Sequence, residues 1–133
     1  MPRTVRYLEL FWNDKDFKKA LKSLPEPEKQ KRLGELVDLT AALASATHAT
    51  HDPSLAPWKP TAYHVRKVGP DVKLYEYRCR YPMRVIARWI EPSEREPEGS
   101  ILFIAATLSH DHERLKEVIF RSREGLVGGE REE

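Results

Sequence analysis

Residues 73–90 read KLYEYRCRYPMRVIARWI, and this stretch decides the fold because it encodes two strands and the turn between them. Residues 73–80 contain two tyrosines, and residues 83–90 contain a valine, two isoleucines and a tryptophan; aromatic and β-branched residues favour extended backbone. Tyr81-Pro82 lies between the two runs and is typical of a turn. The stretch therefore predicts an antiparallel hairpin whose strands carry several arginines.

The length of the hairpin loop decides which side chains share a face of the sheet. Side chains alternate along a strand, so Glu76 and Arg78 point to the same side. A three-residue loop at 80–82 would place Arg78 opposite Arg84 and gather all three charges on one face. A two-residue loop would separate them, because a slip of one residue turns every side chain over. The sequence leaves this choice open.

Three further strands are expected at residues 5–11, 63–68 and 101–108. Residues 101–106 (ILFIAA) are apolar on both faces, which is typical of a strand in the centre of a sheet. The charged segment 92–99 is expected to be a loop.

Helical periodicity precedes and follows these strands. A short helix is expected after Asn13 or Asp14, with an apolar stripe from Phe17 to Leu24, and a second at about 27–47. The buried face predicted for the second helix consists of Leu33, Leu36, Val37, Thr40, Leu43 and Ala44. A last helix is expected to follow Ser109-His110-Asp111-His112 and to bury Leu115, Val118 and Ile119.

The order of elements is strand, two helices, four strands and a helix. Because strands and helices are segregated, the order predicts an α+β fold. We expect an N-terminal strand and a helical hairpin packed on a mainly antiparallel twisted sheet of about five strands, followed by a C-terminal helix. Residues 1–122 are expected to form one domain, and the acidic tail 123–133 to be disordered.

Composition indicates a globular protein of the cytoplasm. The chain has 133 residues, 40% of them hydrophobic and 33% charged, with a net charge of +2. No apolar run reaches the roughly 18 residues of a membrane span, and the N-terminus does not look like a signal peptide. One cysteine, Cys79, cannot form an internal disulfide, and we expect it to be buried and inert.

Positive charge is concentrated in one part of the chain. Residues 59–89 contain eight lysines and arginines against two acids. Such a local excess is typical of a surface that faces a polyanion, although a solvated sheet face balanced by acids elsewhere would give the same pattern. The phosphate-contact candidates are Lys59, Arg66, Lys67, Lys73, Arg80 and Arg88.

The element order, with Leu74-Tyr75-Glu76-Tyr77-Arg78 and Met83-Arg84-Val85-Ile86, resembles the RelE/ParE toxin superfamily and looks closest to its HigB-like members. The resemblance covers about residues 5–120. It implies the toxin of a bacterial type II toxin–antitoxin system, with a cognate antitoxin as partner. RelE- and HigB-type members cleave mRNA on the ribosome without a metal or other cofactor. ParE-type members instead inhibit gyrase.

The resemblance also implies roles for particular residues. Arg84 matches the family's strand arginine, which stabilises the transition-state phosphate, and Glu76 and Arg78 match the Glu and Arg of the preceding strand. Residues 109–112 stand where the family usually carries Lys or Arg pairs, or a His. This chain lacks the C-terminal tyrosine of some family nucleases.

Metal-free RNA cleavage needs a general base, a general acid and cations around phosphorus. His110 and His112 are the candidate base and acid, because histidine titrates near neutral pH. They could equally be solvated residues at a helix start that Ser109 caps. Glu76, flanked by arginines, is expected to organise ion pairs more than to act as a base. A non-catalytic ParE-like inhibitor, or a degenerate toxin-fold protein that binds protein or nucleic acid, is the alternative function.

Two further patterns could indicate a role in binding. Tyr75 and Tyr77 could stack on bases, but their alternation with the charges favours packing against the helices. His48 and His51, near Asp52, could suggest a metal site, but their spacing on a loop fixes no geometry, so no metal is expected.

Overall fold

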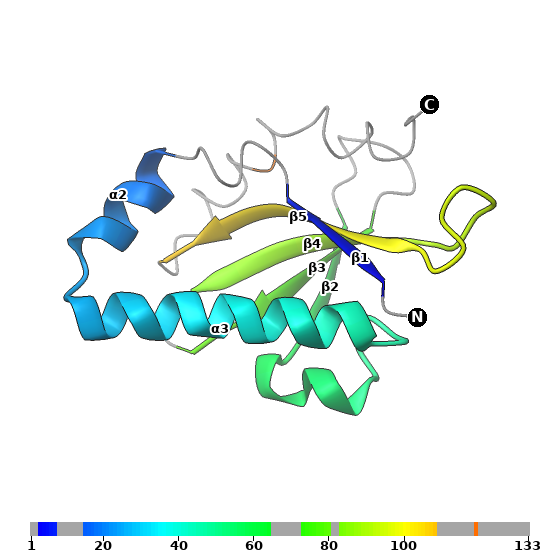
Figure 1. Cartoon of the computed structure of the whole chain (residues 1–133), viewed down its shortest axis with the longest axis horizontal. Helices are drawn as coiled ribbons and strands as arrows, with labels where there is room; N and C mark the ends of the chain where they lie inside the picture. Colours follow the sequence, from blue (N-terminus) through cyan, green and yellow to red (C-terminus); the bar gives the residue numbers. More distant parts are fainter. Residues whose placement is uncertain (1–2, 8–14, 65–72, 81–82, 109–118, 120–133) are drawn as a thin grey trace.

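The computed structural model describes residues 3–7, 15–64, 73–80, 83–108 and 119, with the side chains of residues 63 and 64 excepted. The elements in order are β1 (Thr4–Tyr7), α2 (Lys15–Ser23), α3 (Glu26–Ser45), the 3₁₀ helix η1 (Pro53–Trp58), β2 (Thr61–His64), β3 (Lys73–Arg78), β4 (Arg84–Ile90) and β5 (Ser100–Thr107). Figure 1 shows α3 lying across the sheet. The α+β class is confirmed. Ile119 is helical and buried, whereas the rest of the predicted last helix and the tail lie outside the described residues.

The strands form one mixed sheet in the order β1-β5-β4-β3-β2. β1 pairs with β5 in parallel, and the other three pairings are antiparallel. The prediction of about five mainly antiparallel strands is therefore correct. β5 lies between β1 and β4, and every one of its residues is buried, as its apolar sequence predicts.

α3 packs on one face of the sheet through a stripe different from the predicted one. Leu36, Leu39 and Leu43 are buried in the same core cluster as residues of the strands. Val37, which was expected in the buried face, is 66% exposed, whereas Leu39, which was not, is fully buried. One residue corresponds to about 100° around a helix, so Leu36 and Val37 cannot both face the sheet centrally.

In the described part of the chain no helix is long and apolar enough to cross a membrane.

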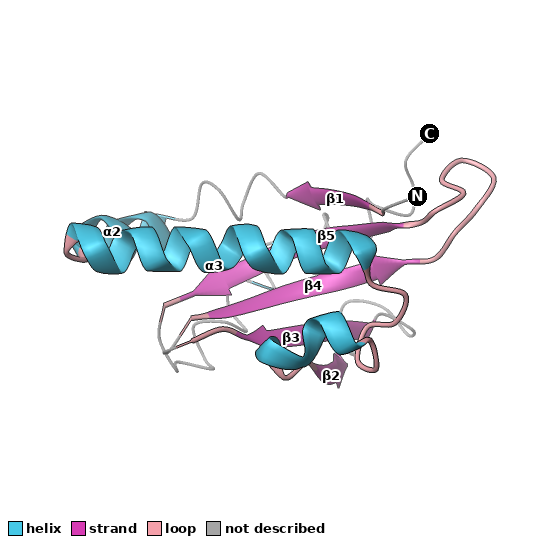
Figure 2. Ribbon diagram, turned by 60° about the horizontal axis from the view of Figure 1, so that its bottom comes forward, coloured by secondary structure: helices cyan, strands magenta, loops and turns pink. Residues whose placement is uncertain are grey.

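The segment after α3 contains an element that the sequence did not predict. Residues 53–58, expected as part of a loop, form η1, which lies on the same face of the sheet as α3 (Figure 2). The Asp52 carboxylate caps it by accepting hydrogen bonds from Ser54 and Thr47. These hydrogen bonds hold the pKa of Asp52 well below its usual range, and the bond from the Ser54 hydroxyl has the largest effect. Trp58 is buried and anchors the segment.

The other face of the sheet is also buried. Leu74 and Ile86 point away from α3 by strand alternation, and neither is exposed to solvent. Glu76 lies on this second face, 5% exposed, among these apolar neighbours. Glu76 therefore sits in a largely desolvated environment.

The corrected stripe of α3 can be tested by two truncations on the same helix. Leu39→Ala should lower the free energy of unfolding by about 2–5 kcal/mol, because it leaves a cavity in the core. Val37→Ala should change it by less than about 0.5 kcal/mol, because the side chain is exposed. Urea denaturation measures both values. Equal losses from the two substitutions would contradict this packing.

Candidate anion-binding site on the β3–β4 hairpin

The register of the hairpin brings the predicted charges together. Arg78 lies directly opposite Arg84, and Glu76 lies opposite Ile86. The Cys79 N–H donates to the Met83 carbonyl at 3.0 Å and closes a loop of three residues. Glu76, Arg78 and Arg84 therefore share one face of the sheet, which was one of the two arrangements that the sequence left open.

Glu76 and Arg84 form an ion pair diagonally across the two strands. An Nη1 of Arg84 donates to Oε2 of Glu76 at 2.7 Å, and the side chains are 13% and 7% exposed. A charge-assisted bond of this length is among the stronger hydrogen bonds in proteins. It gives Glu76 the organising role expected for it and fixes the orientation of the Arg84 guanidinium.

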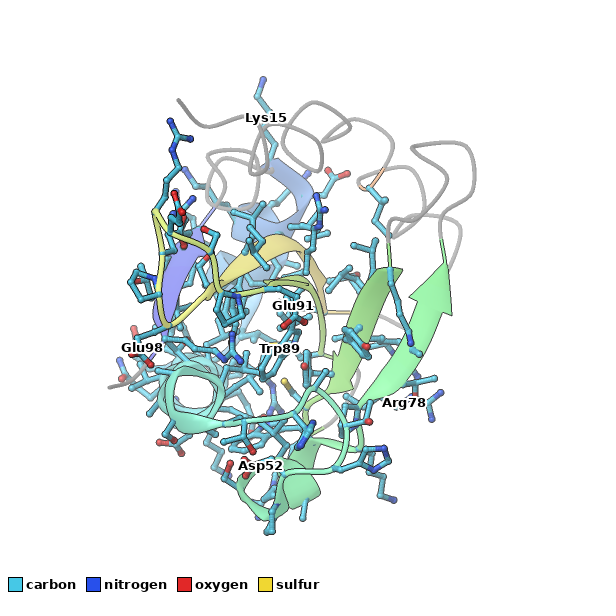
Figure 3. All side chains as sticks on the ribbon, turned by 90° about the vertical axis from the view of Figure 1, so that its right-hand side faces the viewer. Lys15, Asp52, Arg78, Trp89, Glu91 and Glu98 are labelled. Carbon is cyan, nitrogen blue, oxygen red and sulfur yellow. The ribbon has the colours of Figure 1, made fainter. Side chains whose placement is uncertain are left out.

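Arg78 differs from Arg84 in its surroundings. Its side chain is exposed and points outward, away from the interior in which Trp89 lies (Figure 3). Within the described residues Arg78 forms no ion pair. Like charges directly opposite each other in a sheet repel, and Glu76 neutralises one of the two guanidiniums at most. Among the described residues of this face, Arg78 therefore presents an exposed guanidinium to which an anion can bind.

The remaining phosphate-contact candidates are scattered. Lys59, Lys73 and Arg80 are exposed, and the Lys73 Nζ lies 5.6 Å from the centre of the Tyr75 ring. Arg88 is only 8% exposed and therefore does not lie on a surface that RNA could contact, so its prediction as a phosphate contact is not supported. The other predicted residues, Arg66, Lys67, His110 and His112, lie outside the described residues.

Tyr77 belongs to a hydrogen-bonded core that sequence reasoning did not identify. Its hydroxyl accepts from the Trp89 indole N–H at 2.6 Å and donates to the Ala49 carbonyl at 3.3 Å. The side chain is fully buried, and this burial raises the pKa of the phenol. Tyr77 therefore packs under the helices, as its alternation with the charges favoured, and is not available for stacking on a base. Tyr75 is partly buried against the same core.

Cys79 should be unreactive in the native protein. Burial, reinforced by the negative charge of Glu35, raises the pKa of its thiol to about 12, and the thiolate is the nucleophilic form. We expect little alkylation by iodoacetamide at pH 8 in the native state and complete alkylation in guanidinium chloride. The folded-state pKa of the Cys79 thiol exceeds the unfolded one, so the protonated thiol contributes to the free energy of unfolding. This contribution is fully present below the unfolded pKa and is lost as pH rises towards 12. Rapid alkylation of the native protein would contradict the burial.

A double-mutant cycle tests the Glu76–Arg84 pair. Glu76→Ala should cost about 3–5 kcal/mol of unfolding free energy, because it leaves a largely buried guanidinium without its carboxylate. The double variant with Arg84→Ala should lose less than the sum of the single losses, by at least about 1 kcal/mol. Arg78→Ala is the control and should not destabilise the protein. Additive losses for Glu76 and Arg84 would show that the pair is not coupled.

Comparisons of the chain with protein-family models, with curated proteins and with solved structures found no match. The resemblance to RelE/HigB toxins therefore rests on the motif residues and on the order of the elements.

Proposed function

We propose that this protein is the toxin of a type II toxin–antitoxin system and acts as a ribosome-dependent, metal-free mRNA endonuclease. The observation that carries the proposal is the placement of Arg78 opposite Arg84, with Glu76 bonded to Arg84. The exposed Arg78 guanidinium, which forms no ion pair with any residue that the structure describes, is the group that a phosphodiester would meet first. The partners in this proposal are a cognate antitoxin, the ribosome and mRNA, in the cytoplasm, and the fold is RelE-like.

The proposed reaction is attack of a ribose 2′-hydroxyl on the adjacent phosphorus. A bond forms between the 2′-oxygen and phosphorus, the bond from phosphorus to the 5′-oxygen breaks, and negative charge builds on the non-bridging oxygens. The planar fork of Arg84, oriented by Glu76, suits these oxygens. Exposed Arg78 would hold the incoming phosphate. His110 would take the proton from the 2′-hydroxyl, and His112 would give one to the 5′-oxygen.

One feature of the hairpin favours the second candidate function, a non-catalytic toxin-fold protein that binds protein or nucleic acid. The Arg84 guanidinium is already engaged by Glu76, and its side chain is only 13% exposed. A phosphate must therefore approach from the side of Arg78. Binding through Arg78 alone would serve an inhibitor or a degenerate toxin, and would leave RNA intact.

Expression with mapping of RNA ends separates these functions. Induction of the parent chain should arrest growth and create new mRNA 5′ ends. Arg78→Ala should reduce cleavage roughly 10- to 100-fold, the value of one charged hydrogen bond of about 1.5–3 kcal/mol. His110→Ala should abolish cleavage. Arg95→Ala is the matched control, because it removes an exposed arginine from the loop between β4 and β5.

The other outcomes of this experiment are equally informative. Growth arrest with intact mRNA and a DNA-damage response would replace the nuclease with a gyrase inhibitor. Harmless expression, with no RNA cut in the presence of ribosomes, would overturn the proposal of an active toxin. Arg84→Lys, which keeps the charge but loses the fork, should impair cleavage, whereas Arg95→Ala should leave cleavage and growth arrest as in the parent chain.

A further inference from the structure

A second concave site flanks the buried stripe of α3, where η1 and the end of β3 approach the helix. The cavity has a volume of about 600 Å³, within the range of small-molecule sites. The residues that matter for its chemistry are Lys31, Gly34, Asp38, Pro57, Trp58 and Arg80. None of them belongs to the Glu76–Arg84 ion pair.

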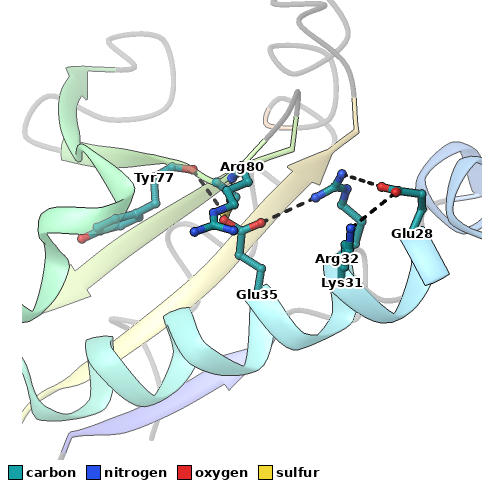
Figure 4. A network of polar contacts seen from close by, with 7 residues as sticks. Glu28, Lys31, Arg32, Glu35, Tyr77 and Arg80 are labelled. Carbon is teal, nitrogen blue, oxygen red and sulfur yellow. Dashed lines mark hydrogen bonds and ion pairs between the residues drawn. The ribbon is translucent and has the colours of Figure 1, made fainter.

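The wall of this groove is held by a polar network (Figure 4). Arg32, only 5% exposed, pairs with Glu28 at 3.1 Å and with Glu35 at 3.8 Å. The Glu35 carboxylate also accepts the backbone N–H of Arg80 at 2.5 Å. These contacts tie the end of β3 to α3, and the charges of Arg32 and Glu35 are satisfied within the chain.

Two other charges in the groove, those of Asp38 and Arg80, have no partner among the described residues. The side chains of Asp38 and Arg80 form no ion pair or hydrogen bond with any residue that the structure describes, and both are exposed. Lys31 makes only a long contact with Glu28, 3.8 Å, and its side chain is 66% exposed. The groove therefore offers one carboxylate and two cations to an occupant.

Gly34 leaves the backbone of α3 uncovered by a side chain where it lines the groove. It lies in the interior of α3, where glycine is less favourable than alanine. A Cβ added at Gly34 would meet nothing within 4 Å, so the described chain gives no reason for a glycine there. A ligand lying against the backbone of α3 would give one, because it needs the space that a side chain would fill.

We propose that this groove binds a guanosine monophosphate unit, either as a free nucleotide or as a residue of RNA. The carboxylate of Asp38 matches the two adjacent donors of guanine, N1–H and the 2-amino group. Adenine presents an acceptor at N1 and would be repelled. Arg80 and Lys31 take the phosphate, and the base lies between Gly34 and the apolar floor of Pro57 and Trp58. The proposal does not depend on the nuclease function.

Isothermal titration with GMP, AMP, guanosine and inorganic phosphate tests the site. GMP should bind at least tenfold more tightly than any of the other three, because only GMP uses both ends of the groove. Asp38→Asn should remove the preference for GMP over AMP, and Arg80→Ala should remove the preference for GMP over guanosine. Absence of GMP binding at millimolar concentration, or equal affinity for AMP, would overturn the proposal.

Gly34→Ala supplies a test that a loss of folding cannot mimic. It should raise the urea midpoint, because alanine favours the helix and its methyl group would meet none of the residues that the structure describes. The same substitution should weaken GMP binding at least tenfold. Unchanged affinity would refute a ligand seated on α3.

Two further measurements show whether the guanosine monophosphate unit comes from RNA or from free nucleotide, and whether its binding is independent of the hairpin site. Competition for GMP by a guanosine-containing single-stranded RNA would assign the groove to RNA, and its absence would assign it to free nucleotide. Arg78→Ala should leave GMP affinity unchanged, so a failure of the nuclease proposal is distinguishable from a failure of this one.

Discussion

The ion pair between Glu76 and Arg84 is the constraint on which the arrangement of the hairpin depends. Its two atoms lie 2.7 Å apart, and both side chains are largely buried. A register slip of one residue would send Arg84 to the other face of the sheet and leave two buried charges without partners. The pair thus selects one register, and that register places Arg78 opposite Arg84.

The sheet around this pair explains why only part of the charge is accessible. β5 is buried along its whole length, and Leu74 and Ile86, which share a face of the sheet with Glu76, are also buried. Burial strengthens the Glu76–Arg84 attraction because fewer water molecules screen it. Arg78, at the end of β3, is exposed. The result is a rigid, buried pair with an accessible cation beside it, an arrangement suited to binding one phosphate group.

The sequence could predict features that follow from local periodicity. The period of two along a strand placed Glu76 with Arg78, and the length of the loop then decided their relation to Arg84. The apolar run of β5 predicted a central strand. In α3 the prediction chose Val37 over Leu39, because apolar residues on neighbouring positions leave the direction of the core ambiguous.

Features that depend on distant partners could not be predicted. The burial of Arg32 is permitted by Glu28 and Glu35, and the Tyr77 hydroxyl finds its partners in Trp89 and Ala49. The parallel pairing of β1 with β5 depends on the path of the chain between them. The groove combines three separate segments of sequence, so no local pattern reveals it.

The most direct measurement is the salt dependence of single-stranded RNA binding by the parent chain, Arg78→Ala and Arg95→Ala. The slope of log K against log salt reports the number of phosphate contacts. The account predicts that Arg78→Ala reduces the magnitude of the slope by about 0.7, the value of one contact on a single strand, and that Arg95→Ala leaves it unchanged. Identical slopes for the parent and Arg78→Ala would contradict an anion-binding site at this end of the hairpin.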